Sequence, residues 1–424
     1  MRDIKKPSFM KDAESNKTHN IFLEICIALL VFLAGSVVMS IVQAPAMMIY
    51  LFNDSDYMKM ITSANFDITS IMNAALNIPE WMMIVMLISE ILLIAIVVLY
   101  CRFIEKRKVY TLGFVKKGAV KNYLLGMLGG AVAFSAAYLI CIVSGAISFE
   151  GVAEGMMPLY IIGYFAGYLV QGMAEEVLCR GYLFVSLTKR CHVTTAVVVS
   201  ALFFAGLHGM NAGVSSLAFL NLFLFGVFAA LLLVDTGSIW MAGAFHSLWN
   251  FAQGNLYGIQ VSGNKVQNSI FTSVSAEHLS FINGGSFGME GGIGVTIVLA
   301  VAIAIVLRRL ERKGLYIDSK EQPSYAEREF ERISKELDAE ENLGRWNPNT
   351  DSSRPQNNDN IWKDGQFNAG QTMHEQDGQQ VQNPDFVNMN GEPGSQNVRQ
   401  IVEEKKKEEE ENRKTNFDEN YFKD

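Results

Sequence analysis

The first three-quarters of this 424-residue chain is a succession of apolar runs, most of them long enough to cross a lipid bilayer. A membrane-spanning helix needs about 20 apolar residues, and in lipid only helices and closed barrels satisfy their own backbone groups. The sequence therefore predicts an all-α protein, a polytopic membrane helical bundle of about eight transmembrane helices. The predicted spans are residues 21–52, 81–101, 123–146, 158–190, 194–210, 214–234, 239–257 and 293–307.

The distribution of basic residues predicts the orientation of these spans. Lysine and arginine gather in residues 1–20, in the loop at 102–121 and at 308–313, whereas the loop that follows residue 146 carries none. Cytoplasmic loops of membrane proteins are enriched in Lys and Arg. With eight spans, every basic cluster and both termini lie on the cytoplasmic side. The predicted location is the cell membrane, as a multi-pass protein.

One span carries an unusual charge cluster, Glu175-Glu176-Val177-Leu178-Cys179-Arg180, in an otherwise apolar run. A charged side chain at the bilayer centre costs about 2.5–3.5 kcal/mol on insertion scales, so such residues are usually paired or functional. Residues four apart share one face of a helix. The spacing predicts an internal Glu176–Arg180 ion pair and directs Glu175 toward a different neighbour.

Two later spans carry further polar pairs with the same spacing, Phe204-x-x-x-His208 and His246-x-x-x-Asn250. In each pair the two side chains stack on one helix face. Glu175 lies 17 residues before His192 and His208 lies 16 residues after it. If the chain reverses near His192, antiparallel helices bring Glu175 and His208 to the same depth.

A carboxylate, two imidazoles and a carboxamide that meet inside a bundle can catalyse hydrolysis. Glu175 could take a proton from water with His208 as a second base. His246 and Asn250 could donate hydrogen bonds to the oxyanion of a tetrahedral intermediate. Alternatively, Glu175, His208 and His246 could bind zinc and leave one position open. The HExxH spacing that would favour zinc is absent, so both a zinc-dependent and a metal-independent reaction stay open.

These three patterns, taken together and in this order, resemble the motifs of the CAAX protease and bacteriocin-processing (CPBP, or ABI) family. That family of polytopic intramembrane proteases includes the type II CAAX prenyl endoproteases, and the resemblance covers roughly residues 80–257. It implies that Glu175 and His208 activate water, that Glu176 and Arg180 orient the site, and that His246 and Asn250 hold the oxyanion. Family members are described both as metalloproteases and as glutamate proteases.

The predicted organisation has four parts. Residues 1–20 form a cytosolic segment, 21–122 the first two spans with a basic loop, 123–313 the catalytic membrane core, and 314–424 an acidic cytosolic tail. The tail contains 25 acidic and 14 basic residues, a net charge of −11, against −8 for the whole chain. Its Asn, Gln, Gly and Pro content predicts disorder over most of its length, with a helix at 323–343.

The predicted function is that of an intramembrane endopeptidase acting on a membrane-associated or lipidated protein or peptide. The expected partners are this substrate and membrane lipid, and no nucleic acid. One alternative is a non-catalytic binding or scaffold protein that regulates a partner or confers bacteriocin immunity. A second is a proton or ion transporter. The sequence argues against it, because it lacks the pairs of interrupted helices that such transporters use. We interpret Glu90, Glu24 and His192 as structural or idle, with Glu24 reaching the cytoplasmic interface.

Overall fold

The computed structural model describes residues 2–13, 19–53, 78–265 and 267–318, together with the single positions 58 and 334. The chain divides into two compact units, Met1–Glu321 and Gln322–Asp424. Nearly all described residues belong to the first unit. The predicted helix at 323–343 and the predicted disorder of the tail lie outside the described residues, except for position 334.

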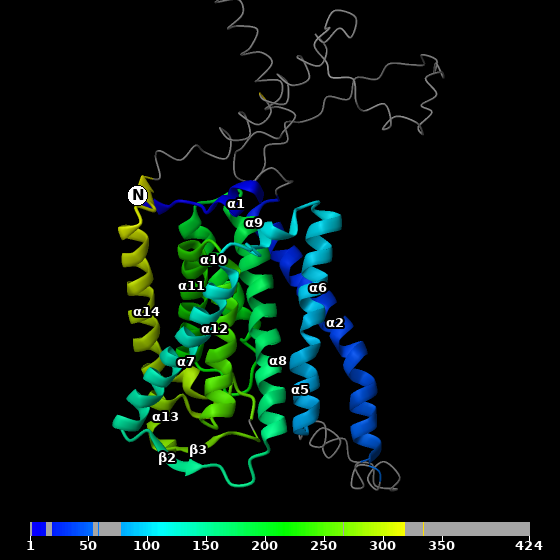
Figure 1. Ribbon diagram of the computed structural model, residues 1–424, viewed down its shortest axis with the longest axis vertical. Helices are drawn as coiled ribbons and strands as arrows, with labels where there is room; N and C mark the ends of the chain where they lie inside the picture. The colour runs from blue at the N-terminus through cyan, green and yellow to red at the C-terminus, as the bar shows by residue number, and fades with distance from the viewer. Residues whose placement is uncertain are drawn as a thin grey trace, which may run out of the picture. The chain divides into compact units, whose positions relative to one another are not determined.

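The first unit is a bundle of helices (Figure 1). Helical segments occupy all eight predicted ranges. The main helices are α2 (Ile21–Asn53), α5 (Glu80–Ser89), α6 (Ile91–Leu99), α7 (Ala119–Val143), α8 (Pro158–Glu176), α9 (Val185–Thr188), α10 (Val193–Leu207), α11 (Ser216–Thr236), α12 (Ile239–Phe251) and α14 (Ile293–Arg312). Stretches of π-helix extend α6 through Tyr100–Ile104, join α8 to α9 through Val177–Phe184, and extend α12 through Ala252–Leu256.

Five of these helical stretches are both long and apolar enough to cross a membrane. They are Ile21–Asn53, Glu80–Ile104, Ala119–Val143, Ser216–Thr236 and Ile293–Arg312. Large apolar side chains on their outer faces are exposed, as lipid-facing residues are: Phe22, Leu30, Ile41, Leu128, Val132 and Val301. The chain is therefore a multi-pass membrane protein. The count of eight spans stays a prediction, because α8, α10 and α12 do not meet the same measure.

Glycines bring α12 into close contact with its two neighbours. On α7, a Cβ atom on Gly126 would lie 2.4 Å from the carbonyl oxygen of Met241. A Cβ atom on Gly130 would lie 2.2 Å from the carbonyl oxygen of Phe245. On the other side, a Cβ atom on Gly172 of α8 would lie 2.5 Å from the backbone nitrogen of Ser247. Small residues allow helix backbones to approach closely in membranes. This packing holds the polar face of α12 against α8.

Two small antiparallel sheets correct the all-α prediction. Strand β1 (Arg2–Ile4) pairs with β4 (Tyr316–Asp318), and β2 (Ile147–Val152) pairs with β3 (Phe271–Ser275). Strands this short lie in segments that the sequence presents only as polar loops. Strand β4 also falls within the predicted tail, so the first residues after 314 pack on the membrane unit.

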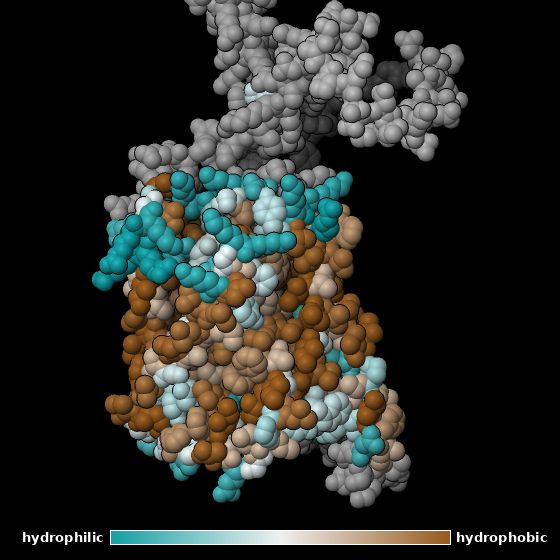
Figure 2. All heavy atoms as spheres, in the orientation of Figure 1, coloured by the Kyte–Doolittle hydropathy of each residue, from teal (hydrophilic) through white to brown (hydrophobic). Residues whose placement is uncertain are grey.

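The N-terminal segment packs against one end of the bundle. Helix α1 (Ser8–Ala13) buries Phe9, Met10 and Ala13. The β2–β3 sheet and α13 (Ser280–Asn283) lie at the opposite end (Figure 1), with three short 3₁₀ turns nearby at Glu277–Leu279, Gly285–Phe287 and Met289–Gly291. Figure 2 shows hydrophilic side chains gathered over the end that carries α1, next to a broad apolar band. We call these the N-terminal end and the hairpin end.

Candidate active site

The predicted Glu176–Arg180 ion pair is present and completely buried. Arg180 Nη1 lies 3.0 Å from Glu176 Oε1, and both side chains have no exposed surface. The guanidinium also stacks over the ring of Phe204, with Cζ 4.4 Å from the ring centroid. This cation–π contact and the ion pair together fix the position of the Glu176 carboxylate.

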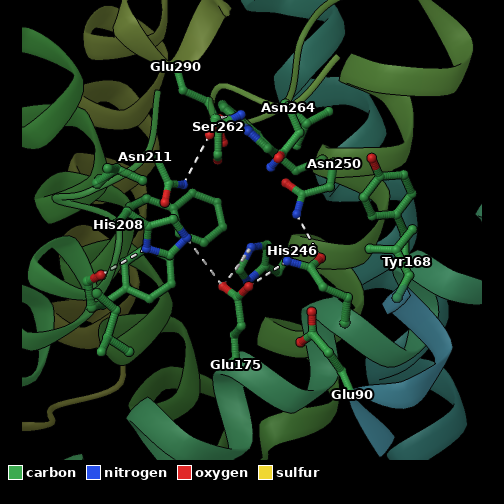
Figure 3. A pocket seen from close by; sticks show the side chains of 18 of the residues that line it. Glu90, Tyr168, Glu175, His208, Asn211, His246, Asn250, Ser262, Asn264 and Glu290 are labelled. Carbon is green, nitrogen blue, oxygen red and sulfur yellow. Dashed lines mark hydrogen bonds and ion pairs between the residues drawn. The ribbon is translucent and has the colours of Figure 1, made fainter. Parts of the chain in front are cut away.

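Glu176 in turn orients His246. The Nδ1 atom of His246 lies 3.1 Å from Glu176 Oε1, and an ionised carboxylate can only accept a hydrogen bond. Nδ1 therefore donates, and Nε2 points the other way, into the interior of the bundle (Figure 3). The contacts from Arg180 to Glu176 and from Glu176 to His246 thus set the tautomer and direction of this imidazole. They do so without exposing the charge of Arg180 or of Glu176 to lipid.

His208 is held in a similar manner by its own helix. Its Nδ1 atom lies 3.0 Å from the carbonyl oxygen of Phe204, so this nitrogen is again the donor. The ring of Phe204 lies 4.8 Å from that of His208 and 5.8 Å from that of His246. The apolar ring therefore lies close to both imidazoles and lines the same cavity.

Glu175 lies where the two free Nε2 atoms converge. Its Oε2 atom is 3.8 Å from Nε2 of His208 and 3.7 Å from Nε2 of His246. The equal depth of Glu175 and His208 that the sequence predicts is therefore confirmed. Oε2 is buried and has no hydrogen-bond partner among the described residues, so it can accept a proton from a bound molecule.

Gln171, to which the sequence patterns assign no role, links Glu175 to Asn250. The Gln171 amide donates from Nε2 to Glu175 Oε1 at 2.5 Å and accepts from Asn250 Nδ2 at 2.9 Å. Gln171 precedes Glu175 by one helical turn, the same spacing as the three motifs, so the signal was present in the sequence. Asn250 Oδ1 is buried and has no partner among the described residues.

These groups line a cavity of about 370 Å³. Glu90, at the junction of α5 and α6, also lines it, and Figure 3 shows its side chain beside Glu175. The interpretation of Glu90 as a structural residue stays a prediction, although its carboxyl group faces the same cavity. No hydrogen bond or ion pair to Glu90's side chain is found among the described residues, unlike the well-contacted Glu176.

A second polar cluster lines the cavity toward the hairpin end. Glu290 Oε2 accepts hydrogen bonds from the backbone nitrogen of Ser262 at 2.8 Å and from its hydroxyl group at 2.7 Å. Asn211 donates to the carbonyl oxygen of Ser262 at 3.0 Å. These contacts hold the turn at 261–264, which also lines the cavity, against the end of α10.

The remaining two polar residues singled out in the sequence have structural partners. Glu24 is buried and accepts a hydrogen bond from the Tyr182 hydroxyl at 3.2 Å, so the expectation that it reaches the interface is wrong. His192 is exposed as expected, yet its Nδ1 atom lies 3.2 Å from Asp3 Oδ2. Both belong to the packing of the N-terminal end and lie outside the cavity.

The donor types around Glu175 suit zinc, but their placement does not form a metal centre. Both histidines already donate from Nδ1, as zinc-bound histidines do. However, in the part of the chain that the structure describes, no three His, Cys, Asp or Glu side chains are gathered closely enough to hold a metal ion. We therefore derive no catalytic step through a metal.

Comparison with known families identifies the segment that carries the site. Residues 157–252 match the family described as type II CAAX prenyl endopeptidase Rce1-like. This segment is therefore similar to the CAAX protease (CPBP) family. The match contains all three motifs and ends two residues after Asn250, in agreement with the resemblance found in the sequence. Among curated proteins, none matches this chain.

Proposed function

We propose that this chain is an intramembrane endopeptidase that hydrolyses a peptide bond of a membrane-associated protein or peptide. The observation that carries the proposal is the position of Glu175 Oε2, 3.8 and 3.7 Å from the free nitrogens of two oriented imidazoles. It lies in a cavity large enough for a short peptide segment. The family match supports peptide hydrolysis as the reaction class.

In the proposed reaction Glu175 is the general base. A water molecule between Glu175 and His208 gives its proton to Glu175 as its oxygen attacks the peptide carbonyl carbon. The carbonyl oxygen becomes an oxyanion in the tetrahedral intermediate. When the carbon–nitrogen bond breaks, the proton passes to the leaving nitrogen, which departs as an amine. The products are a carboxylic acid, which then ionises, and an amine, and the base is restored.

His246 and Asn250 are the proposed oxyanion donors. Asn250 Nδ2 uses one proton on Gln171, which leaves its second amide proton for the substrate. His246 donates from Nε2 only when both ring nitrogens carry protons, because Nδ1 already donates to Glu176. The carboxylates of Glu175 and Glu176 lie 3.7 and 3.1 Å from Nε2 and Nδ1 of this ring, respectively. Oxyanion stabilisation of this kind is often the largest single contribution to catalysis.

The proposal is tested with purified protein in detergent and a pool of internally quenched fluorogenic peptides. We expect Glu175→Gln to lower the cleavage rate by about 100- to 10,000-fold, the range assigned to general acid–base catalysis. Glu90→Gln is the matched control, because it makes the same change at a carboxyl group of the same cavity that contacts neither imidazole. It should stay within tenfold of the unsubstituted chain.

The same assay separates the rival functions. Unchanged cleavage by Glu175→Gln would contradict the proposal, and an unsubstituted chain that cleaves no peptide would favour the scaffold function. Treatment of the purified protein with a chelator tests whether the reaction depends on zinc, with Glu175, His208 and His246 as the ligands. Full activity of metal-stripped protein supports the metal-independent reaction, and loss of activity that only added zinc restores supports the metalloprotease.

A further inference from the structure

The residues that line the cavity come from one half of the bundle, the half nearer the hairpin end. His208 lies at the C-terminal end of α10, and Asn221 and Phe225 lie in the first turns of α11, which begins at that same end. Val295 and Leu299 lie in the first two turns of α14, which also begins there. The cavity therefore extends from the depth of Glu175 toward the hairpin end.

The opposite half of the bundle is closed. Every residue from Val177 to Lys189 is buried, and in this stretch only Leu178 and Cys179 line the cavity. Beyond it, Arg107 donates to Glu105 at 3.2 Å and to Ser186 at 3.0 Å, and Lys6 donates to the carbonyl oxygen of Thr188. A peptide cannot reach Glu175 from the N-terminal end without displacing this packed layer.

The mouth of the cavity is polar and lies in the loops of the hairpin end. Asn211, Ser262, Asn264 and Lys265 line it, and Asn264 and Lys265 are exposed. Amide and hydroxyl groups of this kind can hydrogen-bond an extended peptide backbone. On its side toward α2 and α5 the lining is mostly apolar and includes Phe32, Met39, Met83 and Met86, with Ser36 and Gln43 as its polar members.

Charge distinguishes the two ends. In the described loops of the hairpin end, residues 144–157, 208–215, 257–265 and 267–292, Lys265 is the only Lys or Arg. At the N-terminal end, the segment 102–121 leads into α7. This one segment carries many basic residues: Arg102, Lys106, Arg107, Lys108, Lys116, Lys117 and Lys121. The positive-inside rule assigns the N-terminal end to the cytoplasm and the hairpin end to the opposite side.

We propose that the active-site cavity opens away from the cytoplasm, and that its substrate is a membrane-anchored protein cleaved in a segment presented at the extracytoplasmic surface. The apolar flank beside α2 and α5 would lie against the anchor, and the amide-lined mouth would hold the extended segment. This inference rests on the proposed endopeptidase function. It excludes a lipidated C-terminus that enters from the cytoplasm as the substrate.

Cysteine labelling tests the direction in which the cavity opens. Asn264→Cys places a thiol at the mouth, and Lys117→Cys, also at an exposed polar position, places one at the N-terminal end. In intact cells a membrane-impermeant maleimide should label Asn264→Cys, and should label Lys117→Cys only after the cells are permeabilised. The unsubstituted chain, with its own five cysteines, gives the background. The reverse labelling pattern would overturn the proposal.

A second measurement connects that surface with the site. In detergent, a bulky maleimide on Asn264→Cys should lower cleavage of the fluorogenic peptide pool at least tenfold, whereas the same reagent on Lys117→Cys should leave the rate unchanged. Loss of activity on modification of Lys117→Cys alone would overturn the inferred opening and leave the proposed function intact. Absence of Glu175-dependent cleavage before modification would instead contradict the proposed function, whichever variant is labelled.

Discussion

Helix α8 and its continuation to Thr188 pass through two contrasting environments. Around Glu175, polar groups face a cavity, and the buried Glu175 Oε2 and Asn250 Oδ1 atoms have no hydrogen-bond partner among the described residues. From Arg180 onward the side chains are packed on all sides, and the charges there are paired, as in the contacts of Glu105 with Arg107 and Lys189. One helix thus changes from an open to a closed half of the bundle.

This difference separates two uses of buried polar groups. Unpaired polar atoms in a low-dielectric interior are costly, so their presence in the open half indicates groups kept for a ligand. In the closed half the charges lie in ion pairs, although Nε and Nη2 of Arg180 have no hydrogen-bond partner among the described residues. Removal of one charge there leaves its partner unpaired. Substitutions in the closed half should therefore reduce stability, and substitutions in the open half should reduce rate.

The largest stability effect is expected at the boundary between the halves. Arg180→Ala would leave the Glu176 carboxylate buried without its partner, at a cost of about 3–5 kcal/mol for a fully buried pair. The midpoint of thermal unfolding in detergent should fall well below that of Glu175→Gln. Arg180→Lys keeps the charge but loses the planar contact with Phe204, and should fall between the two. Equal midpoints for Arg180→Ala and Glu175→Gln would contradict the division into structural and chemical groups.

The sequence predicted the site because its signals are local. Polar residues four apart in an apolar helix must share a face, so Glu176–Arg180, Phe204–His208 and His246–Asn250 could be placed before the fold was known. The place of Glu90 in the cavity wall could not be predicted, because it depends on the packing of α5 on α8, which no short spacing encodes. The two sheets and the docking of α1 were missed for a similar reason: their pairing joins residues some 120 or more positions apart.

The next effect tests the open half and should appear in rate. Asn250→Ala removes one proposed oxyanion donor, a change that typically lowers the rate by about 100- to 1,000-fold, or roughly 2.7–4 kcal/mol in the transition state. Peptide binding should be nearly unaffected, so the loss should appear in kcat rather than KM. Asn250→Asp, nearly the same size but without the amide donor, should be as slow. Near-normal kcat in both variants would remove Asn250 from the mechanism.

The smallest effect lies at the N-terminal end, far from the cavity. Asp3 accepts hydrogen bonds from the backbone nitrogens of Val193 and Thr194 at 3.2 and 3.1 Å, and so caps α10 from a distant strand. Burial alone would raise the pKa of the Asp3 carboxyl, but these hydrogen bonds outweigh it and hold the pKa below its ordinary value. Loss of a helix cap typically costs about 1 kcal/mol, so Asp3→Ala should lower stability by that amount and leave kcat unchanged.

The depressed pKa of Asp3 also gives this prediction a pH dependence of known sign. The folded state favours the ionised carboxylate, so its stabilisation is fully present above the ordinary Asp pKa of about 3.9. It is lost as the pH falls through the lower pKa of the folded state. The difference in unfolding midpoint between the unsubstituted chain and Asp3→Ala should therefore be constant near neutral pH and shrink in acid. Asp3→Asn, which keeps an acceptor oxygen but cannot ionise, should lose less at neutral pH than Asp3→Ala. A difference that instead grew in acid would show that Asp3 acts through some contact other than its capping carboxylate.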